Sequence, residues 1–254
     1  MKSLSERQKE IKERFISERG YWAEFWDDLL RLNEDFFEAY LKFSAVPWKK
    51  GAIEPKVKEL IYVAIDASTT HLYEPGIQAH MQNALRYGAT PEEIMEVFEL
   101  TSVLGIHTCT SGIPILVDEL KNNGVELKQE LSERQQKLKD QFKEARGYWS
   151  ELWDQFLLLD DEFFEAYLEF SSVPWKKGTL DPKIKEFIYI AIDVATTHLY
   201  DSGTRIHIKN ALKYGATKEE IMEVFQLVSV LGIHTCTVGV PILVEELKNL
   251  RVNN

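Results

Sequence analysis

The chain has 254 residues, and its 44% hydrophobic and 28% charged residues indicate a globular rather than a disordered protein. With 41 acidic and 30 basic residues, its formal charge is −11, and such an acidic surface argues against nucleic acid as a partner. We find no apolar run of the roughly 18–20 residues that a membrane span needs and no secretory signal at the start, so we expect a cytoplasmic protein with no membrane partner.

In chain order, helical periodicity predicts the first elements. Apolar residues at three- and four-residue spacing predict a helix over residues 22–30 and, after a break at Asn33, a second over 36–41. Glu54-Pro55 is typical of an N-cap followed by proline at the first helical position, which predicts a third helix over 57–70.

Later in the chain, Thr90-Pro91-Glu92-Glu93 is a capping-box signature that predicts a helix to about Leu104. A further helix is expected after Pro114, ending near Lys121. Because no segment alternates polar and apolar residues, the sequence predicts an all-α fold.

The whole pattern occurs twice at a constant offset of 127 residues. Of the 103 paired positions from Gly20 to Asn122, 71 are identical in the second copy. This period is too long for a solenoid unit and fits a whole domain. We therefore expect two tandem copies of one helical domain, residues 1–126 and 127–254.

Residues able to carry chemistry gather around Pro75-Gly76, where a helix is expected to break. The first copy holds His71, Glu74 and His80 there, and the second holds His198, Asp201 and His207. Two imidazoles and a carboxylate at a helix–helix corner favour either proton relay or a divalent metal site.

Some of these residues also have purely structural interpretations. Glu74 and Asp201 are typical N-cap residues, and His107 is typical of a hydrogen-bonded core histidine. Asp66 interrupts an apolar run, and we expect it to hydrogen-bond locally with the threonines that follow it.

Two motifs in each copy resemble the carboxymuconolactone decarboxylase family, which also contains the AhpD-like alkylhydroperoxidases. In the first copy they are P-K-V-K-E-L-I at Pro55–Ile61 and A-L-R-Y-G-A-T-P-E-E-I-M-E-V at Ala84–Val97. The resemblance spans about Pro47–Leu120 and Pro174–Leu247, and it implies an all-α, oligomeric fold.

The resemblance also implies site residues. His80 and His207 match the histidine of the family, and Glu59 and Glu186 are the corresponding candidates for a proton relay.

The family's two cysteines, in contrast, fall on His71 and Glu74, so neither copy has the C-x-x-C pair that thiol–disulfide peroxidase chemistry needs. Hydroperoxide reduction by that route is therefore not expected.

Together these features predict a cofactor-free acid–base enzyme of the decarboxylase type. Its partner would be a small oxygenated organic acid or lactone, and its reaction decarboxylation, isomerisation or lactone opening. Lys49-Lys50 and Lys176-Lys177 are candidates to attract a carboxylate. The expected roles are acid–base transfer for His80 and His207, assistance by His71 and His198, and orientation by Glu74 and Asp201.

Two alternatives are open. The first is a metal enzyme that holds a divalent transition metal through residues of one copy, namely His71, Glu74, His80 and His107, or His198, Asp201, His207 and His234. The second is a non-catalytic scaffold, which predicts only structural hydrogen bonds and a pocket too small for a ligand. Because family relatives assemble, we expect a homo-oligomer, a trimer of tandem chains.

Overall fold

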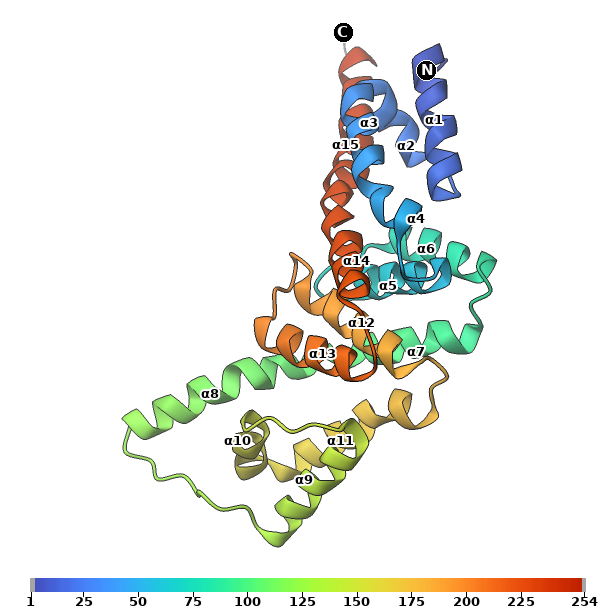
Figure 1. The fold of residues 1–254 in the computed structure, drawn as a ribbon. Helices are drawn as coiled ribbons and strands as arrows, with labels where there is room; N and C mark the ends of the chain where they lie inside the picture. The colour runs from blue at the N-terminus through green and yellow to red at the C-terminus, as the bar shows by residue number, and fades with distance from the viewer. Residues whose placement is uncertain (1–2, 253–254) are drawn as a thin grey trace. The chain divides into compact units, whose positions relative to one another are not determined.

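The computed structural model describes residues 3–252, and within this range the regular structure is helical, without a strand (Figure 1). The all-α prediction is therefore confirmed. The helices are α1 (Glu6–Arg19), α2 (Phe25–Leu32), α3 (Glu34–Ser44), α4 (Val46–Lys50), α5 (Pro55–Ala67), α6 (Glu74–Arg86), α7 (Pro91–Ser102), the 3-10 turn η1 (Val103–Ile106), α8 (His107–Asn122), α9 (Glu133–Arg146), α10 (Leu152–Leu159), α11 (Asp161–Lys177), α12 (Pro182–Val194), α13 (Asp201–Lys213), α14 (Lys218–Ser229), η2 (Val230–Ile233) and α15 (His234–Val252).

The two copies fold into corresponding series of helices, except that α11 of the second copy spans the positions of both α3 and α4 of the first. Thr90 opens α7 through the predicted capping box with Glu93, and Thr217 opens α14 in the same way with Glu220. Asn33 caps α3 by accepting a hydrogen bond from the Phe36 N–H at 3.0 Å, which explains the break predicted there.

Two compact units divide the chain differently from the repeat. One unit combines the chain up to Ala89 with the chain from Glu186 onward, and the other is Thr90–Lys185. The first unit thus contains helices from both copies. The boundary between domains near residues 126 and 127 stays a prediction.

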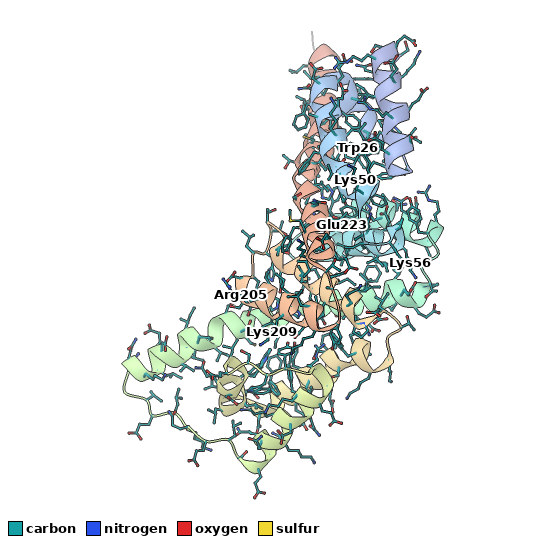
Figure 2. The ribbon with its side chains drawn as sticks, viewed as in Figure 1. Trp26, Lys50, Lys56, Arg205, Lys209 and Glu223 are labelled. Atoms are coloured by element: carbon teal, nitrogen blue, oxygen red, sulfur yellow. The ribbon has the colours of Figure 1, made fainter. Side chains whose placement is uncertain are left out.

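The core of the first unit is built around aromatic side chains of its N-terminal helices. Phe15 on α1 is fully buried, and its ring lies 5.4–5.8 Å from those of Tyr21, Trp22, Trp26 and Phe37. These contacts bury the apolar faces of α1, α2 and α3, and Figure 1 shows α15 running beside them. Figure 2 labels Trp26 within this core.

The second unit repeats this arrangement with the residues of the other copy. Phe142 on α9 is fully buried and contacts the rings of Tyr148, Trp149, Trp153 and Phe164. The 3-10 turn η1 packs on the same cluster through Ile106, and the start of α8 does so through Cys109 and Ile113.

Three of the predicted helix limits are wrong. The helix expected over 22–30 begins at Phe25. The helix expected over 57–70 ends at Ala67, because a tight turn begins at Ser68. The helix expected after Pro114 begins at His107, immediately after η1, and contains the proline in its interior. Pro114 has no N–H to donate, so one helical hydrogen bond is missing there, but α8 continues on both sides of it.

The expectation that no segment has the length and apolar character of a membrane span is also wrong. The helical stretches Pro91–Asn122 and Lys218–Leu250 meet that criterion, with mean hydropathies of 1.5 and 2.0. A third of each apolar window is buried inside the protein (33%). Core helices of soluble proteins meet the same criterion.

A buried ion pair joins the two copies inside the first unit. Lys58 Nζ lies 2.8 Å from Glu223 Oε1 and donates a hydrogen bond to Pro47 O at 2.6 Å. Glu223 Oε2 accepts from the backbone N–H groups of Ala52 and Ile53 at 2.6 and 2.9 Å. Figure 2 labels Glu223 on α14, so a helix of the second copy holds the α4–α5 loop of the first.

The second unit has the equivalent arrangement. Lys185 Nζ lies 2.7 Å from Glu96 Oε1 on α7 and donates to Pro174 O at 2.6 Å. Glu96 Oε2 accepts from the N–H groups of Thr179 and Leu180 at 2.6 and 2.9 Å. Each copy therefore supplies one buried glutamate to the other.

Candidate functional site

The hairpin of α5 and α6 brings Glu59 to His80. The Tyr73 N–H donates to Asp66 O at 2.8 Å, which closes the turn between the two helices. From this bond, seven residues back along α5 lead to Glu59 and seven forward along α6 lead to His80. Equal steps of about 10 Å along two packed helices place both residues at the same level.

Glu59 and His80 form a buried hydrogen bond. His80 Nδ1 donates to Glu59 Oε2 at 2.6 Å, and Asn83 Nδ2 donates to Glu59 Oε1 at 3.3 Å. The ring of Tyr62 stacks on that of His80 with 4.4 Å between centroids. Because Nδ1 is bonded to Glu59, the other ring nitrogen, Nε2, points away from Glu59. Nε2 is therefore the nitrogen that can exchange a proton with a substrate.

The second copy has the same pair. His207 Nδ1 donates to Glu186 Oε2 at 2.6 Å, and Asn210 Nδ2 donates to Glu186 Oε1 at 3.3 Å. Tyr189 stacks on His207 with 4.6 Å between centroids. The geometry of the predicted relay residues is thus duplicated within the first unit.

A strained turn positions His71. Leu72, the next residue, has φ +49°, and Leu199 in the second copy has φ +51°, both in the left-handed region that a leucine rarely adopts. The N–H groups of His71 and Leu72 both donate to Ser68 O, at 2.8 and 2.9 Å. The turn therefore fixes the direction of the His71 side chain.

Asp66 faces the histidines, contrary to the local hydrogen bonds with threonines that the sequence predicted. It is fully buried, and Oδ2 lies 4.0 Å from His80 Nε2. None of the described residues donates a hydrogen bond to either carboxylate oxygen. Burial raises the pKa of Asp66 to about 7, against the opposing charge of His80. Burial likewise raises the pKa of Asp193, its counterpart, to about 7.

His234 of the second copy completes the cluster. Its Nδ1 lies 2.8 Å from His71 Nε2, and its ring stacks on Tyr73 with 4.0 Å between centroids. The Tyr73 hydroxyl donates to Thr237 Oγ1 at 2.5 Å. Burial, with the neighbouring His71 and His80, lowers the pKa of His234 to about 3, and burial also lowers that of His71.

The two predicted carboxylates, Glu74 and Asp201, lie at helix starts outside this cluster. Glu74 is exposed at the first position of α6, and Asp201 is exposed on α13, where it pairs with Arg205 at 2.8 Å. Neither orients a histidine, because both side chains point to solvent at helix starts. His198 is half-buried in the turn after α12, and His107 is half-buried at the start of α8 in the second unit.

A small cavity lies beside His80, with a volume of about 20 Å³, room for roughly one water molecule. One of its lining residues is a buried cation, Arg19, which has only 3% of its surface exposed. Arg19 Nη1 donates to Ser44 O at 2.9 Å, while Nε has no hydrogen-bond partner among the described residues. The cavity is further lined by Tyr21, Tyr40, Tyr62, Tyr73, His234 and Thr237.

Arg19 is not among the residues that the sequence predicts for the site, and the predicted carboxylate-attracting residues are Lys49-Lys50. Lys49 instead forms an exposed ion pair with Glu18 at 2.8 Å, and Lys50 is exposed. One available signal was that Arg19 recurs as Arg146 at the offset of 127. A recurring arginine next to an aromatic segment does not by itself reveal which cavity it lines.

Each copy of this helical chain thus holds a Glu–His hydrogen bond and lacks the C-x-x-C pair that thiol–disulfide exchange needs. The chain belongs to the carboxymuconolactone decarboxylase family, whose sequence profile matches residues 34–106 and 161–232.

A solved structure is similar over nearly the whole chain. It is a crystal structure from Burkholderia xenovorans LB400, provisionally named a gamma-carboxymuconolactone decarboxylase subunit. It is 46% identical, covers 95% of this chain and 98% of its own, and superposes with a TM-score of 0.93. No curated protein is significantly similar in sequence.

Proposed function

We propose that the protein is an acid–base enzyme that acts on a small oxygenated organic acid or lactone. The observation that carries this proposal is the buried hydrogen bond of 2.6 Å from His80 to Glu59, repeated between His207 and Glu186. A carboxylate behind an imidazole fixes its tautomer and stabilises the imidazolium, which suits the ring to give and take a proton.

The proposed substrate class is a carboxylated, unsaturated lactone, as in the name of the similar crystal structure. In a decarboxylation, the carbon–carbon bond to the carboxylate breaks and CO₂ leaves. The electron pair of that bond passes into the conjugated carbonyl of the substrate. His80 Nε2–H then delivers a proton to carbon. Arg19, buried in the same cavity, would bind a second carboxylate that is not lost.

The small cavity bears on the non-catalytic alternative, which predicted a pocket too small for a ligand. The cavity has a volume of about 20 Å³, so a substrate can enter only if the lining side chains move. Several buried polar groups at the site nevertheless lack hydrogen bonds within the described chain, among them the carboxylate of Asp66 and Nε of Arg19. A purely structural role does not account for them, because unpaired buried polar groups are costly. These groups favour a ligand.

The proposal is tested by following candidate substrates by NMR in D₂O, beginning with gamma-carboxymuconolactone and continuing with related lactones and enol acids. Turnover is expected to place solvent deuterium on the carbon that gains the proton. If no member of this panel reacts, the chain is the non-catalytic scaffold and the proposal is wrong. Product that gains no deuterium would contradict proton delivery by a group in exchange with solvent.

A variant of Arg19 tests the proposed carboxylate contact. Arg19→Gln, in a chain whose second copy is silenced by His207→Asn, is expected to raise KM about 10- to 100-fold, because a charge-assisted hydrogen bond contributes about 1.5–3 kcal/mol. Steady-state kinetics with the reactive substrate measure this change. Arg19→Lys should restore part of the affinity, and an unchanged KM in Arg19→Gln would remove Arg19 from substrate binding.

We further propose that the chain acts in the cytoplasm as a homo-oligomer, a trimer of tandem chains. Exposed apolar side chains along α15 support self-association, among them Val238, Ile242 and Leu243. Light scattering coupled to size-exclusion chromatography is expected to give three times the chain mass. A monomer across micromolar concentrations would contradict it.

A further inference from the structure

Three potential metal ligands converge between the copies. His71 Nε2 and His234 Nδ1 lie 2.8 Å apart, and each lies 3.7 Å from Asp66 Oδ1. A point equidistant from these three atoms is about 2.0 Å from each. Zinc bonds to imidazole nitrogen at about 2.0–2.1 Å and to carboxylate oxygen at about 2.0–2.2 Å. The three atoms are therefore close enough together for one ion, and each ring has to turn from its present nitrogen-to-nitrogen contact, with 5.1 Å between centroids, to direct its lone pair at that ion.

The carboxylate in this cluster is buried without a hydrogen bond. Asp66 is fully buried, and no described residue donates to either of its oxygens. Gly76 makes room for it, because a Cβ at that position would collide with Asp66 Oδ2. A desolvated carboxylate without donors is costly, and a bound cation compensates it directly.

The surroundings hold the two imidazoles in place. The ring of Tyr73 stacks on His234, and its hydroxyl is tied to Thr237 on the next turn of α15. The turn that begins at Ser68 holds the backbone of His71 in place, and Leu72 completes this turn in the left-handed backbone region. Contacts of this kind limit how far each ligand has to move to bind an ion.

The geometry points to a binding site for a divalent first-row transition ion, of the Zn²⁺ type, formed by Asp66, His71 and His234. Two imidazoles and one carboxylate form a ligand set suited to such ions, and three protein ligands leave a further position open. His234 lines the cavity, which has room for one water molecule on the ion. Glu74, the carboxylate that the sequence favoured, is exposed and takes no part.

Binding requires one proton to move. The 2.8 Å contact between His71 and His234 is a hydrogen bond, so one of the two nitrogens carries a proton. Coordination needs both lone pairs, so the ring that donates this hydrogen bond releases that proton to water and takes up one at its other nitrogen, remaining neutral. No electron is transferred. The inference does not rest on the proposed reaction, because ion binding needs no substrate.

The test is Zn²⁺ binding to the full chain, prepared without a histidine tag and freed of metal with a chelator. Competition with a chromophoric chelator measures affinity and stoichiometry. Asp66→Asn, which is nearly isosteric, and His71→Asn, at a partly exposed ring, are each expected to remove one equivalent of bound Zn²⁺ per chain. The affinity at this site is expected to fall by at least about 100-fold. Glu74→Gln is the matched carboxylate control and should bind as the wild type does.

Thermal unfolding with and without Zn²⁺ shows whether the variants are folded. Zn²⁺ should raise the Tm of the wild type and of Glu74→Gln, and should raise it less in Asp66→Asn, because an ion that binds only the folded state stabilises it. Equal Zn²⁺ stoichiometry and affinity in the wild type and in folded Asp66→Asn would overturn the inference. Loss of Zn²⁺ in Glu74→Gln but not in Asp66→Asn would overturn it as well.

Discussion

Replacing Glu59 and Glu186 with glutamine in one chain is expected to lower kcat by about 100- to 1000-fold, with little change in KM. Each glutamate accepts the Nδ1–H of a histidine at 2.6 Å, and each is buried behind that histidine. Glutamine removes the charge that stabilises the imidazolium, and its amide N–H₂ can reverse the tautomer. The substrate is therefore bound as before, but protons are transferred slowly.

Steady-state kinetics with the substrate found by NMR measure this effect. Both copies must be changed, because an intact second copy would hide the loss in the first. Glu99→Gln is the matched control, since the second copy already carries Gln226 at the equivalent position. A double variant with wild-type kcat would exclude both glutamates as positioning residues for the histidines.

Glu223→Gln is expected to reduce the free energy of unfolding by about 3 kcal/mol, because it leaves the ammonium group of Lys58 buried without its counter-charge. The side chains of Lys58 and Glu223 are only 4% and 3% exposed. Glutamine can still accept from the N–H groups of Ala52 and Ile53, so the loss reports on the charge pair. Urea unfolding followed by circular dichroism measures the difference.

Two further variants test this interpretation. Glu219→Gln changes an exposed glutamate on the same helix and should alter stability by less than about 0.5 kcal/mol. Adding Lys58→Met to Glu223→Gln should restore stability, because no unpaired charge is then buried. A Glu223→Gln variant as stable as the wild type would contradict a structural role for the pair.

The helices were predictable because their signals are local. Thr90 with Glu93 and Asn33 cap helices where the sequence places them, and the period of 127 residues predicts the second copy from the first. The start of α8 was not predictable from Pro114. A proline shows that one helical hydrogen bond is missing, but it does not show whether the helix begins there or passes through it.

The site was predictable only in part, because its contacts join distant segments. Glu59 and His80 follow from a family motif, and the hairpin of α5 and α6 explains how they meet. The contact between His71 and His234 joins the two copies, whereas local spacing predicts a separate set of ligands within each copy. Local spacing also favoured Glu74 over Asp66, because it does not show which carboxylate is buried.

The most direct test of the proton-transfer site is the turnover of a chain with His80→Asn and His207→Asn, measured by NMR in D₂O beside the wild type and each single variant. Each single variant is expected to retain the activity of its intact copy. The double variant should lose turnover by at least about 100-fold while remaining folded by circular dichroism. A folded double variant that turns over substrate near the wild-type rate would contradict proton transfer by these histidines.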